Sequence, residues 1–162
     1  DVILFVSEDV HPSIEFDVLI KAPPYCLVSA SHHLAGQSSV TMAEIAREPL
    51  IVLNRPVAAS YYQGLFDTHT RRTPIAAYAN ATEMVRSLVA AEQGCAILNM
   101  RPLTSDSYTG AQVVELPISD PLPHLTLAVA YDKSRPRRLV QLFVEACQAY
   151  FANAAPDQCI VS

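Results

Sequence analysis

Polar residues recur in this sequence at the points where apolar, strand-like runs end. They follow the runs at 2–6, 50–53 and 95–98, or begin the helical stretch after residue 79: Ser7, Asn54, Arg55, Asn80, Thr82 and Asn99. If these ends converge, they offer hydrogen-bond donors, a fixed positive charge and a helix N-terminus, which together suit a small carboxylate or another anion. Taken singly, each residue is better explained as a helix cap or a turn residue. The prediction of a binding site therefore depends on their repeated placement.

Other residues with reactive or metal-binding side chains lack the partners that their chemistry needs. Cys95 follows Gly94 but opens an apolar strand, and the sequence has no GxSxG turn to present a nucleophile. His32 and His33 are adjacent, so they cannot share a face of a regular helix or strand, and we expect solvated loop histidines instead of metal ligands. The glycines form neither a GxGxxG nor a Walker pattern. We therefore expect no catalytic residue, no metal and no cofactor.

The composition is that of a soluble globular protein. With 162 residues, 51% of them hydrophobic, the chain can bury a core as one domain or two small lobes. Its formal net charge of −5 predicts no general attraction to nucleic acid, and no apolar run reaches the ~18 residues of a membrane span. The widely spaced cysteines favour buried, reduced thiols in a cytosolic protein: Cys26, Cys95, Cys147 and Cys159. Because the chain begins directly in a strand, we expect it to continue upstream.

A strand, a helix and a second strand between residues 74 and 98 must position several of the polar residues. The helix is capped by Asn80 or Thr82 and ends at Gly94, which supplies a left-handed stop before the second strand. Its predicted apolar stripe is Met84, Val85, Leu88 and Val89. The natural closure is a right-handed crossover between parallel neighbours, which places the helix N-terminus beside the carboxyl end of a strand, where ligands of open α/β sheets collect.

The remaining pattern predicts a mixed α/β protein. We expect further strands at Val2–Val6, Ile14–Ile20, Tyr25–Ala30, Leu50–Leu53, Gln112–Leu116 and His124–Tyr131, the first of them buried on both faces. A capping box of Thr41 and Glu44 opens a helix at Met42–Arg47, and a second helix is predicted at Ala59–Arg72 after a polar turn. The last helix is predicted to have Pro136 in its first turn. The predicted buried stripe of this last helix is Leu139, Val140, Leu142, Phe143, Ala146, Tyr150 and Phe151.

Several segments occur in a recognisable order across nearly the whole chain. They are DVILFV, a strand ending in LVSASHHLAG, VTMAEIAREPLIVLN, ATEMVRSLVAAEQGCAILNM, and PLPHLTLAVAYDKSRP before a terminal helix. In these segments the sequence resembles the effector-binding domain of LysR-type transcriptional regulators, with its patterns HPLAG, LADLAxEPLI and VAAGLGIALLP. The chain departs from the last pattern over Glu92–Cys95, and the proline that closes that strand is displaced to Pro102. The winged helix-turn-helix and the first part of the family's first lobe have no counterpart before Asp1.

The resemblance implies a type 2 periplasmic-binding-protein-like fold, with two Rossmann-like α/β lobes joined by two crossing segments. The crossings would fall near Lys21–Pro24 and Ser119–Pro123. Residues 24–120 would form the second lobe, residues 1–20 and 122–151 an incomplete first lobe, and residues 152–162 a tail. Because half of the first lobe's sheet would be missing, we expect that lobe to be unstable or completed by another copy of the chain, as a dimer or tetramer.

The resemblance also implies a role in sensing a small molecule. The family's effector contacts correspond here to Val6 and Ser7, to Asn54, Arg55 and Pro56, and to Asn80 and Thr82, with Asn99 a weaker match. A small polar or anionic effector, such as a carboxylate, would bind between the lobes and alter DNA binding by the absent winged helix-turn-helix. The alternatives are a solute-binding protein of a transport system and an enzyme on the same scaffold, although no convincing acid–base pair is present.

Overall fold

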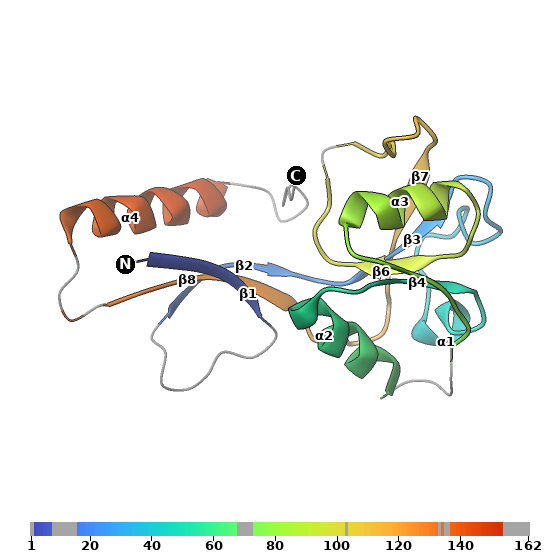
Figure 1. The fold of residues 1–162 in the computed structure, drawn as a ribbon, viewed down its shortest axis with the longest axis horizontal. Helices are drawn as coiled ribbons and strands as arrows, with labels where there is room; N and C mark the ends of the chain where they lie inside the picture. Colours follow the sequence, from blue (N-terminus) through green and yellow to red (C-terminus); the bar gives the residue numbers. More distant parts are fainter. Residues whose placement is uncertain are drawn as a thin grey trace. The chain divides into compact units, whose positions relative to one another are not determined.

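The computed structural model describes residues 2–7, 16–67, 73–102, 104–132, 134 and 137–153. The elements in chain order are β1 (Val2–Ser7), β2 (Phe16–Ala22), β3 (Tyr25–Ser29), α1 (Met42–Ile45), β4 (Leu50–Leu53), α2 (Pro56–Asp67), β5 (Ile75–Ala79), α3 (Thr82–Ala90), β6 (Ala96–Leu98), β7 (Val113–Pro117), β8 (Leu125–Tyr131) and α4 (Arg138–Asn153) (Figure 1). The predicted mixed α/β class is confirmed. None of the helices in these ranges is long and apolar enough to cross a membrane.

The chain divides into two compact units. The first unit comprises Asp1–Pro23, Met100–Pro102 and His124–Ser162, and the second comprises Pro24–Asn99 and Leu103–Pro123. The chain therefore leaves the second unit twice, directly after Asn99 and directly after Pro123.

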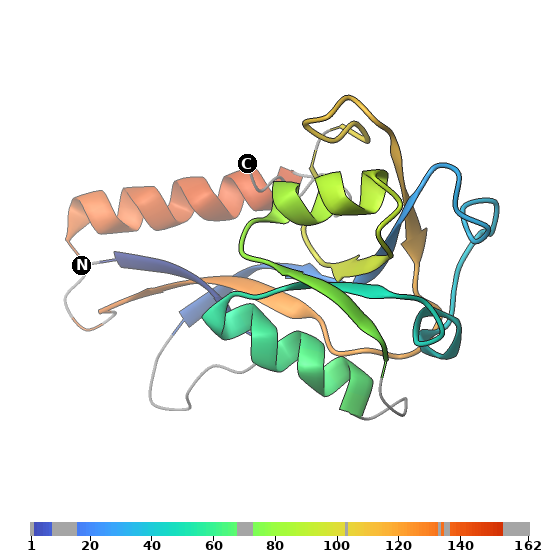
Figure 2. The ribbon, with the colours of Figure 1, turned by 45° about the vertical axis from the view of Figure 1, so that its right-hand side comes forward.

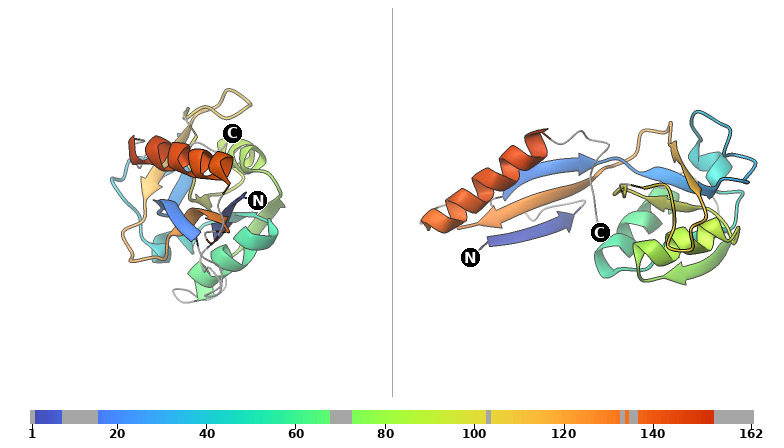
Figure 3. Two further views of the ribbon diagram at one scale, coloured as in Figure 1. Left: turned by 90° about the vertical axis from the view of Figure 1, so that its left-hand side faces the viewer. Right: turned by 90° about the horizontal axis from the view of Figure 1, so that it is seen from above.

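The first unit is an antiparallel sheet of three strands in the order β1-β8-β2, with α4 packed against β2 (Figure 3). The prediction that β1 is buried on both faces is wrong, because Ile3 and Leu4 are 62% and 49% exposed. The reason is that β1 pairs with β8 alone among the described strands, which makes it an edge strand.

The predicted apolar stripe of α4 is also largely wrong. Leu139 is 80% exposed and Tyr150 is 60% exposed. The residues that face the unit follow an i, i+4, i+7, i+11 pattern, with Val144 buried and Val140, Cys147 and Phe151 half-buried. A helix that is apolar over much of its circumference does not show in sequence which stripe packs against the sheet.

The second unit carries a longer sheet made of two parts. The first part is antiparallel in the order β6-β3-β7, and the second is the parallel pair β4-β5. A parallel bridge joins them, since the Ile51 N–H donates to the Cys95 carbonyl at 2.8 Å and the Cys95 N–H donates to the Pro49 carbonyl at 2.9 Å. Strand β4 therefore lies between β5 and β6. The prediction that these two strands are direct neighbours is wrong, although both run parallel to β4.

Helices cover both faces of this longer sheet. Helix α3 packs over β3, β4 and β5 on one face, and α2 packs on β4 on the other (Figures 1 and 2). The core between these layers contains β3, which is buried along its whole length, together with Val85, Val89, Ile51 and Leu65.

Two helices differ in length from the prediction. Thr41 and Glu44 form the predicted capping box of α1, but the helix ends at Ile45 and is shorter than expected. Helix α2 begins at Pro56, where a turn was expected, because proline at the first helical position loses no intrahelical hydrogen bond. The predicted end of α2 at Arg72 lies outside the described residues.

Helix α3 has ends different from those predicted. Its N-cap is Ala81, with no side-chain capping bond, so the capping roles of Asn80 and Thr82 are wrong. At its C-terminus the left-handed residue is Glu92, with φ 61°, and not Gly94. Gly94 has φ 151°, and a Cβ there would lie 2.3 Å from the Pro49 carbonyl oxygen. Glycine is therefore required at position 94 for the close approach of two backbones.

The inward face of α3 holds a charged residue that the apolar pattern did not predict. Met84 is 54% exposed, whereas the Arg86 side chain is completely buried. Its Nε lies 3.1 Å from Glu83 Oε1 and its Nη1 lies 3.7 Å from Glu115 Oε1. Nη2 donates to the carbonyls of Thr104 and Asp106 at 2.7 and 3.1 Å. Arg86 thus ties α3 to β7 and to the loop before it.

Candidate ligand-binding site

The carboxyl ends of β4, β5 and β6 meet at one edge of the second unit's sheet. Leu53 pairs with Ala79 at the ends of β4 and β5, and the bridge from Leu50 to Cys95 sets β6 in the same direction. The residues that follow these strands are the ones the sequence analysis singled out in this unit: Asn54, Arg55, Pro56, Asn80, Thr82 and Asn99. We call the five that follow β4 and β5 the strand-end site: Asn54, Arg55, Pro56, Asn80 and Thr82.

One backbone hydrogen bond and one side-chain hydrogen bond hold the two halves of the strand-end site together. The Asn54 N–H donates to the Ala79 carbonyl at 2.7 Å, and the Arg55 Nε–H donates to the Asn80 carbonyl at 3.2 Å. Asn54, Arg55 and Asn80 are exposed, and Thr82 is half-buried. The guanidinium of Arg55 is thereby held beside the turn that leads into α3, in contact with solvent.

Two helices begin at this edge, and each adds partial positive charge. Helix α2 starts at Pro56 directly after Arg55, and α3 starts at Thr82 shortly after Asn80. Helix N-termini attract anions through their unbonded N–H groups and the aligned peptide dipoles. The one acidic residue in the first turn of α3, Glu83, is paired with Arg86. The arrangement favours a negatively charged ligand.

Asn99 lies at the end of β6 but points its amide into the unit. It is 5% exposed, and its Nδ2–H donates to Tyr61 Oη at 2.9 Å. The Tyr61 hydroxyl in turn donates to the Pro123 carbonyl at 2.7 Å. Asn99 and Pro123 are the two residues after which the chain leaves the second unit, so Tyr61 anchors both exit points. The sequence analysis did not identify Tyr61, because no local pattern shows that its hydroxyl meets Asn99 and Pro123.

Val6 and Ser7 end β1 in the first unit, opposite Leu127 and Thr126 of β8. They are therefore not among the residues that the sheet of the second unit brings together. Their predicted role as effector contacts stays a prediction.

The described cysteines agree with the prediction of reduced thiols. Cys26, Cys95 and Cys147 are free, and the first two are buried. A hydrogen bond with Cys95 and then burial raise the pKa of Cys26 well above its usual value. Both effects keep the thiol protonated at neutral pH, in the form that is a poor nucleophile. Cys159 lies outside the described residues.

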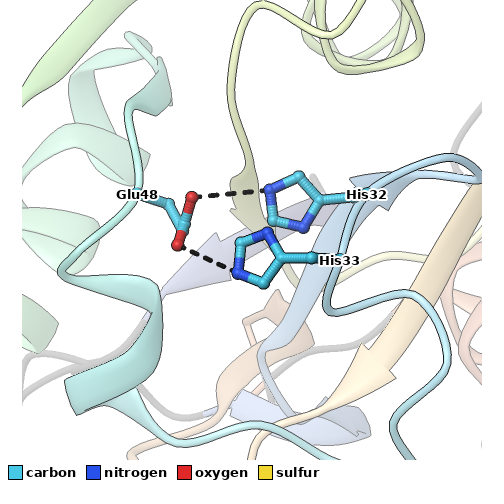
Figure 4. A group of neighbouring side chains, drawn as sticks. All are labelled: His32, His33 and Glu48. Carbon is cyan, nitrogen blue, oxygen red and sulfur yellow. Dashed lines mark ion pairs between the residues drawn. The ribbon is translucent and has the colours of Figure 1, made fainter.

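A second polar group of this unit lies in two turns, away from regular helices and strands. His32 and His33 follow β3, and both reach Glu48 in the turn after α1 (Figure 4). The imidazole rings lie 4.4 Å apart between centroids. The expectation of solvated loop histidines is wrong for His32, whose side chain is 17% exposed. Adjacent residues cannot share a face of a helix, but a turn allows both to point in one direction.

Comparison with known proteins places the chain in a family. The profile of the LysR substrate binding domain matches residues 1–152. A similar solved structure is HinK, a LysR family transcriptional regulator from Pseudomonas aeruginosa, with 28% identity and a TM-score of 0.85 over 93% of this chain and 53% of that chain. The C-terminal domain of a probable LysR family regulator from Rhodococcus sp. RHA1 has 25% identity and a TM-score of 0.81, over 91% and 73% of the two chains.

A third structure carries a ligand. The BenM effector binding domain with its effector benzoate has 17% identity and a TM-score of 0.74, over 100% of this chain and 76% of that chain, which shows a likeness in fold alone. No curated protein sequence matches the chain. The chain spans about half the length of HinK.

The family profile covers all the elements described above, from β1 into the last turn of α4. The solved regulators share the same fold, which is of the type 2 periplasmic-binding-protein-like kind. The chain therefore belongs to the LysR substrate-binding-domain family.

Proposed function

We propose that this chain is the ligand-sensing domain of a LysR-type DNA-binding transcriptional regulator. It binds a small polar or anionic metabolite, and ligand binding changes DNA binding by a winged helix-turn-helix outside this chain. The family match and the likeness to HinK support this role. The intact protein would act as a dimer or tetramer in the cytoplasm, and DNA would be a partner of the intact protein only.

One observation carries the choice of an anionic ligand. The strand-end site combines one exposed guanidinium with the N-termini of two helices at the carboxyl edge of parallel strands. Open α/β sheets bind their ligands at this edge. A carboxylate is the simplest group that fits, and benzoate, the effector of BenM, is a carboxylate.

Arg55 is the residue with the clearest role in this proposal. Its Nε–H is used by the Asn80 carbonyl, which orients the guanidinium and leaves its terminal N–H groups to approach a carboxylate. Asn54, Asn80 and Thr82 would supply further polar contacts, together with the backbone N–H groups of the first turn of α3. Asn99 has a structural role in this proposal, because its side-chain amide donates to Tyr61 Oη inside the unit.

The two units of the chain correspond in this proposal to the two lobes of the family's fold. The predicted placement of the ligand between the lobes, with Val6 and Ser7 as contacts from the first, stays a prediction. A rearrangement of the lobes would follow if the ligand binds one arrangement more tightly than the other.

A thermal-shift screen against benzoate, hydroxy acids, phosphorylated acids and amino acids tests the proposal. We expect a rise in melting temperature that grows with ligand concentration. Arg55→Ala should weaken the binding of the best ligand at least tenfold, which is ~1.4 kcal/mol. The matched control is Arg47→Ala, which removes another exposed arginine, from the turn after α1.

Equal losses of affinity in the two arginine variants would show general charge attraction and contradict a site at Arg55. Binding that is unchanged in Arg55→Ala would place the ligand elsewhere. The alternative of a transport solute-binding protein has no support from the family match, so we do not propose it.

A further inference from the structure

Two histidines and a glutamate from two different turns converge in the second unit. His32 Nε2 lies 3.5 Å from Glu48 Oε2, and His33 Nε2 lies 3.3 Å from Glu48 Oε1 (Figure 4). One ligand atom from each of the three residues lies within 4.8 Å of the other two. We propose that this histidine cluster, made of His32, His33 and Glu48, binds a divalent transition-metal ion of the Zn²⁺ kind.

The spacing of the ligand atoms suits such an ion. Tetrahedral zinc has bonds of about 2.0–2.1 Å to imidazole nitrogen and carboxylate oxygen, which sets neighbouring ligand atoms about 3.4 Å apart. In the histidine cluster each imidazole nitrogen lies at about this spacing from one oxygen of Glu48, at 3.5 Å from Oε2 for His32 and at 3.3 Å from Oε1 for His33. An ion could therefore bind both imidazoles and the carboxylate with small movements of the side chains.

Burial and charge also favour a cation here. The side chains of His32 and Glu48 are 17% and 19% exposed, so water competes weakly for them, whereas His33 is 64% exposed and leaves the cluster open to solvent. An open side provides the fourth position that water or a small ligand occupies on many zinc ions. The negative charge of Glu92, which accepts a hydrogen bond from Ser31, also acts on His32.

The hydrogen bonds of His32 bear on how it would bind an ion. Its Nδ1 accepts the Leu34 N–H at 3.2 Å, so the ring proton lies on Nε2, toward Glu48. Metal binding would move that proton to Nδ1 and break the Leu34 bond. A neutral hydrogen bond is worth about tenfold in an equilibrium constant, so its loss weakens the site without abolishing it.

This inference does not rest on the proposed function. The histidine cluster and the strand-end site share no residue and favour ligands of opposite charge. Loss of one activity can therefore be measured while the other is kept.

Cobalt titration of the untagged, metal-free chain tests the inference directly. Co²⁺ replaces Zn²⁺ at nitrogen–oxygen sites and absorbs visible light when four- or five-coordinate. We expect one equivalent of Co²⁺ to bind with a dissociation constant of about 1–100 μM. We also expect Zn²⁺ to displace it, because Zn²⁺ loses no ligand-field stabilisation on entering a tetrahedral site. His33→Gln should weaken binding at least tenfold, and because His33 is exposed this variant should fold normally.

Two further variants complete the test. Glu48→Gln should also lose at least tenfold in affinity, since the neutral amide no longer attracts the ion. His124→Gln is the matched control, because it removes an exposed histidine from the first unit and should leave the isotherm unchanged. Absence of saturable binding below about 1 mM in the folded chain would overturn the inference. Equal affinity in the parent chain and His33→Gln would also overturn it.

Discussion

The strand-end site and the histidine cluster belong to the same unit but are built in different ways. Parallel strands and the helices that follow them bring the residues of the strand-end site together, and its positive charge comes from Arg55 and two helix N-termini. Two irregular turns bring the histidine cluster together, and its charge comes from the carboxylate of Glu48. One group favours an anion and the other a cation.

The difference shows which kinds of site follow from a sequence. Strand ends are visible as polar residues after apolar runs, and the parallel arrangement then dictates that they meet. Turns carry no such periodicity, so the sequence cannot indicate that His32, His33 and Glu48 face one another.

Arg86→Met should lower the free energy of unfolding by about 3–5 kcal/mol, because it leaves Glu83, Glu115 and two carbonyls without their buried partner. Urea unfolding at pH 7 measures the loss. Since α3 serves the strand-end site and also packs on β3 and β4, both sites should fail together once the variant unfolds. Arg47→Met, at an exposed position, should stay within about 0.5 kcal/mol of the parent. A loss below 1 kcal/mol in Arg86→Met would show that the buried network is not needed.

Gly94→Ala should cost about 1–3 kcal/mol, because the residue has φ 151° and its Cβ would meet the Pro49 carbonyl oxygen. Pro49 follows Glu48, so we also expect weaker Co²⁺ binding with little change in anion binding. The control is Gly36→Ala in the loop between β3 and α1, where an added Cβ would meet nothing within 4 Å. Equal stability of the two alanine variants, measured by thermal unfolding, would contradict the close approach at Gly94.

Tyr61→Phe should lower the unfolding free energy by about 1–2 kcal/mol, because it removes the bridge between Asn99 and Pro123 while keeping the ring. Hydrogen exchange of the amides near these residues should become faster. Tyr62→Phe is the matched control, since Tyr62 is the neighbouring buried ring on the same helix. The same loss in both variants would indicate a general cost of removing a buried hydroxyl, and not an anchor at Tyr61.

The smallest expected effect is on the pH dependence of the free energy of unfolding. Because the pKa of His32 is lower in the folded chain, the unfolded chain takes up a proton first as the pH falls below about 6.5. The contribution of His32 to stability is therefore present above that pH and is lost as the pH falls toward the folded pKa. Urea unfolding between pH 7.5 and 5.5 should show a shallower decline in His32→Gln than in the parent chain. If stability declines equally steeply with falling pH in His32→Gln and in the parent chain, His32 is not the cause of the decline.

Much of the architecture was predictable because it depends on local pattern. The capping box of Thr41 and Glu44, the strand at Leu50–Leu53 and the buried strand after Gly94 appear as predicted. The strand-end residues were identified because apolar runs mark where strands stop. Their contact with a ligand is still a prediction.

The sequence predictions are wrong at positions where contacts between distant elements determine the structure. Met84 is exposed against expectation, and Arg86 is buried because Glu83, Glu115 and two carbonyls contact its guanidinium. The apolar residue Leu139 is exposed because α4 contacts the sheet through another stripe. Strand β4 separates β5 from β6 because strand order depends on contacts far apart in the sequence. No local signal carries this information.

The most direct test of an anion site at the strand ends is a titration of the ¹⁵N-labelled chain with benzoate, followed by amide chemical shifts. We expect saturable shifts at Asn54, Arg55 and the first turn of α3, with no change at His32 or His33. The dissociation constant should be about 1 mM or lower, which corresponds to a binding free energy of at least about 4 kcal/mol. These shifts should shrink in Arg55→Ala. Saturable shifts located elsewhere in the second unit, or unchanged in Arg55→Ala, would contradict an anion site at the strand ends.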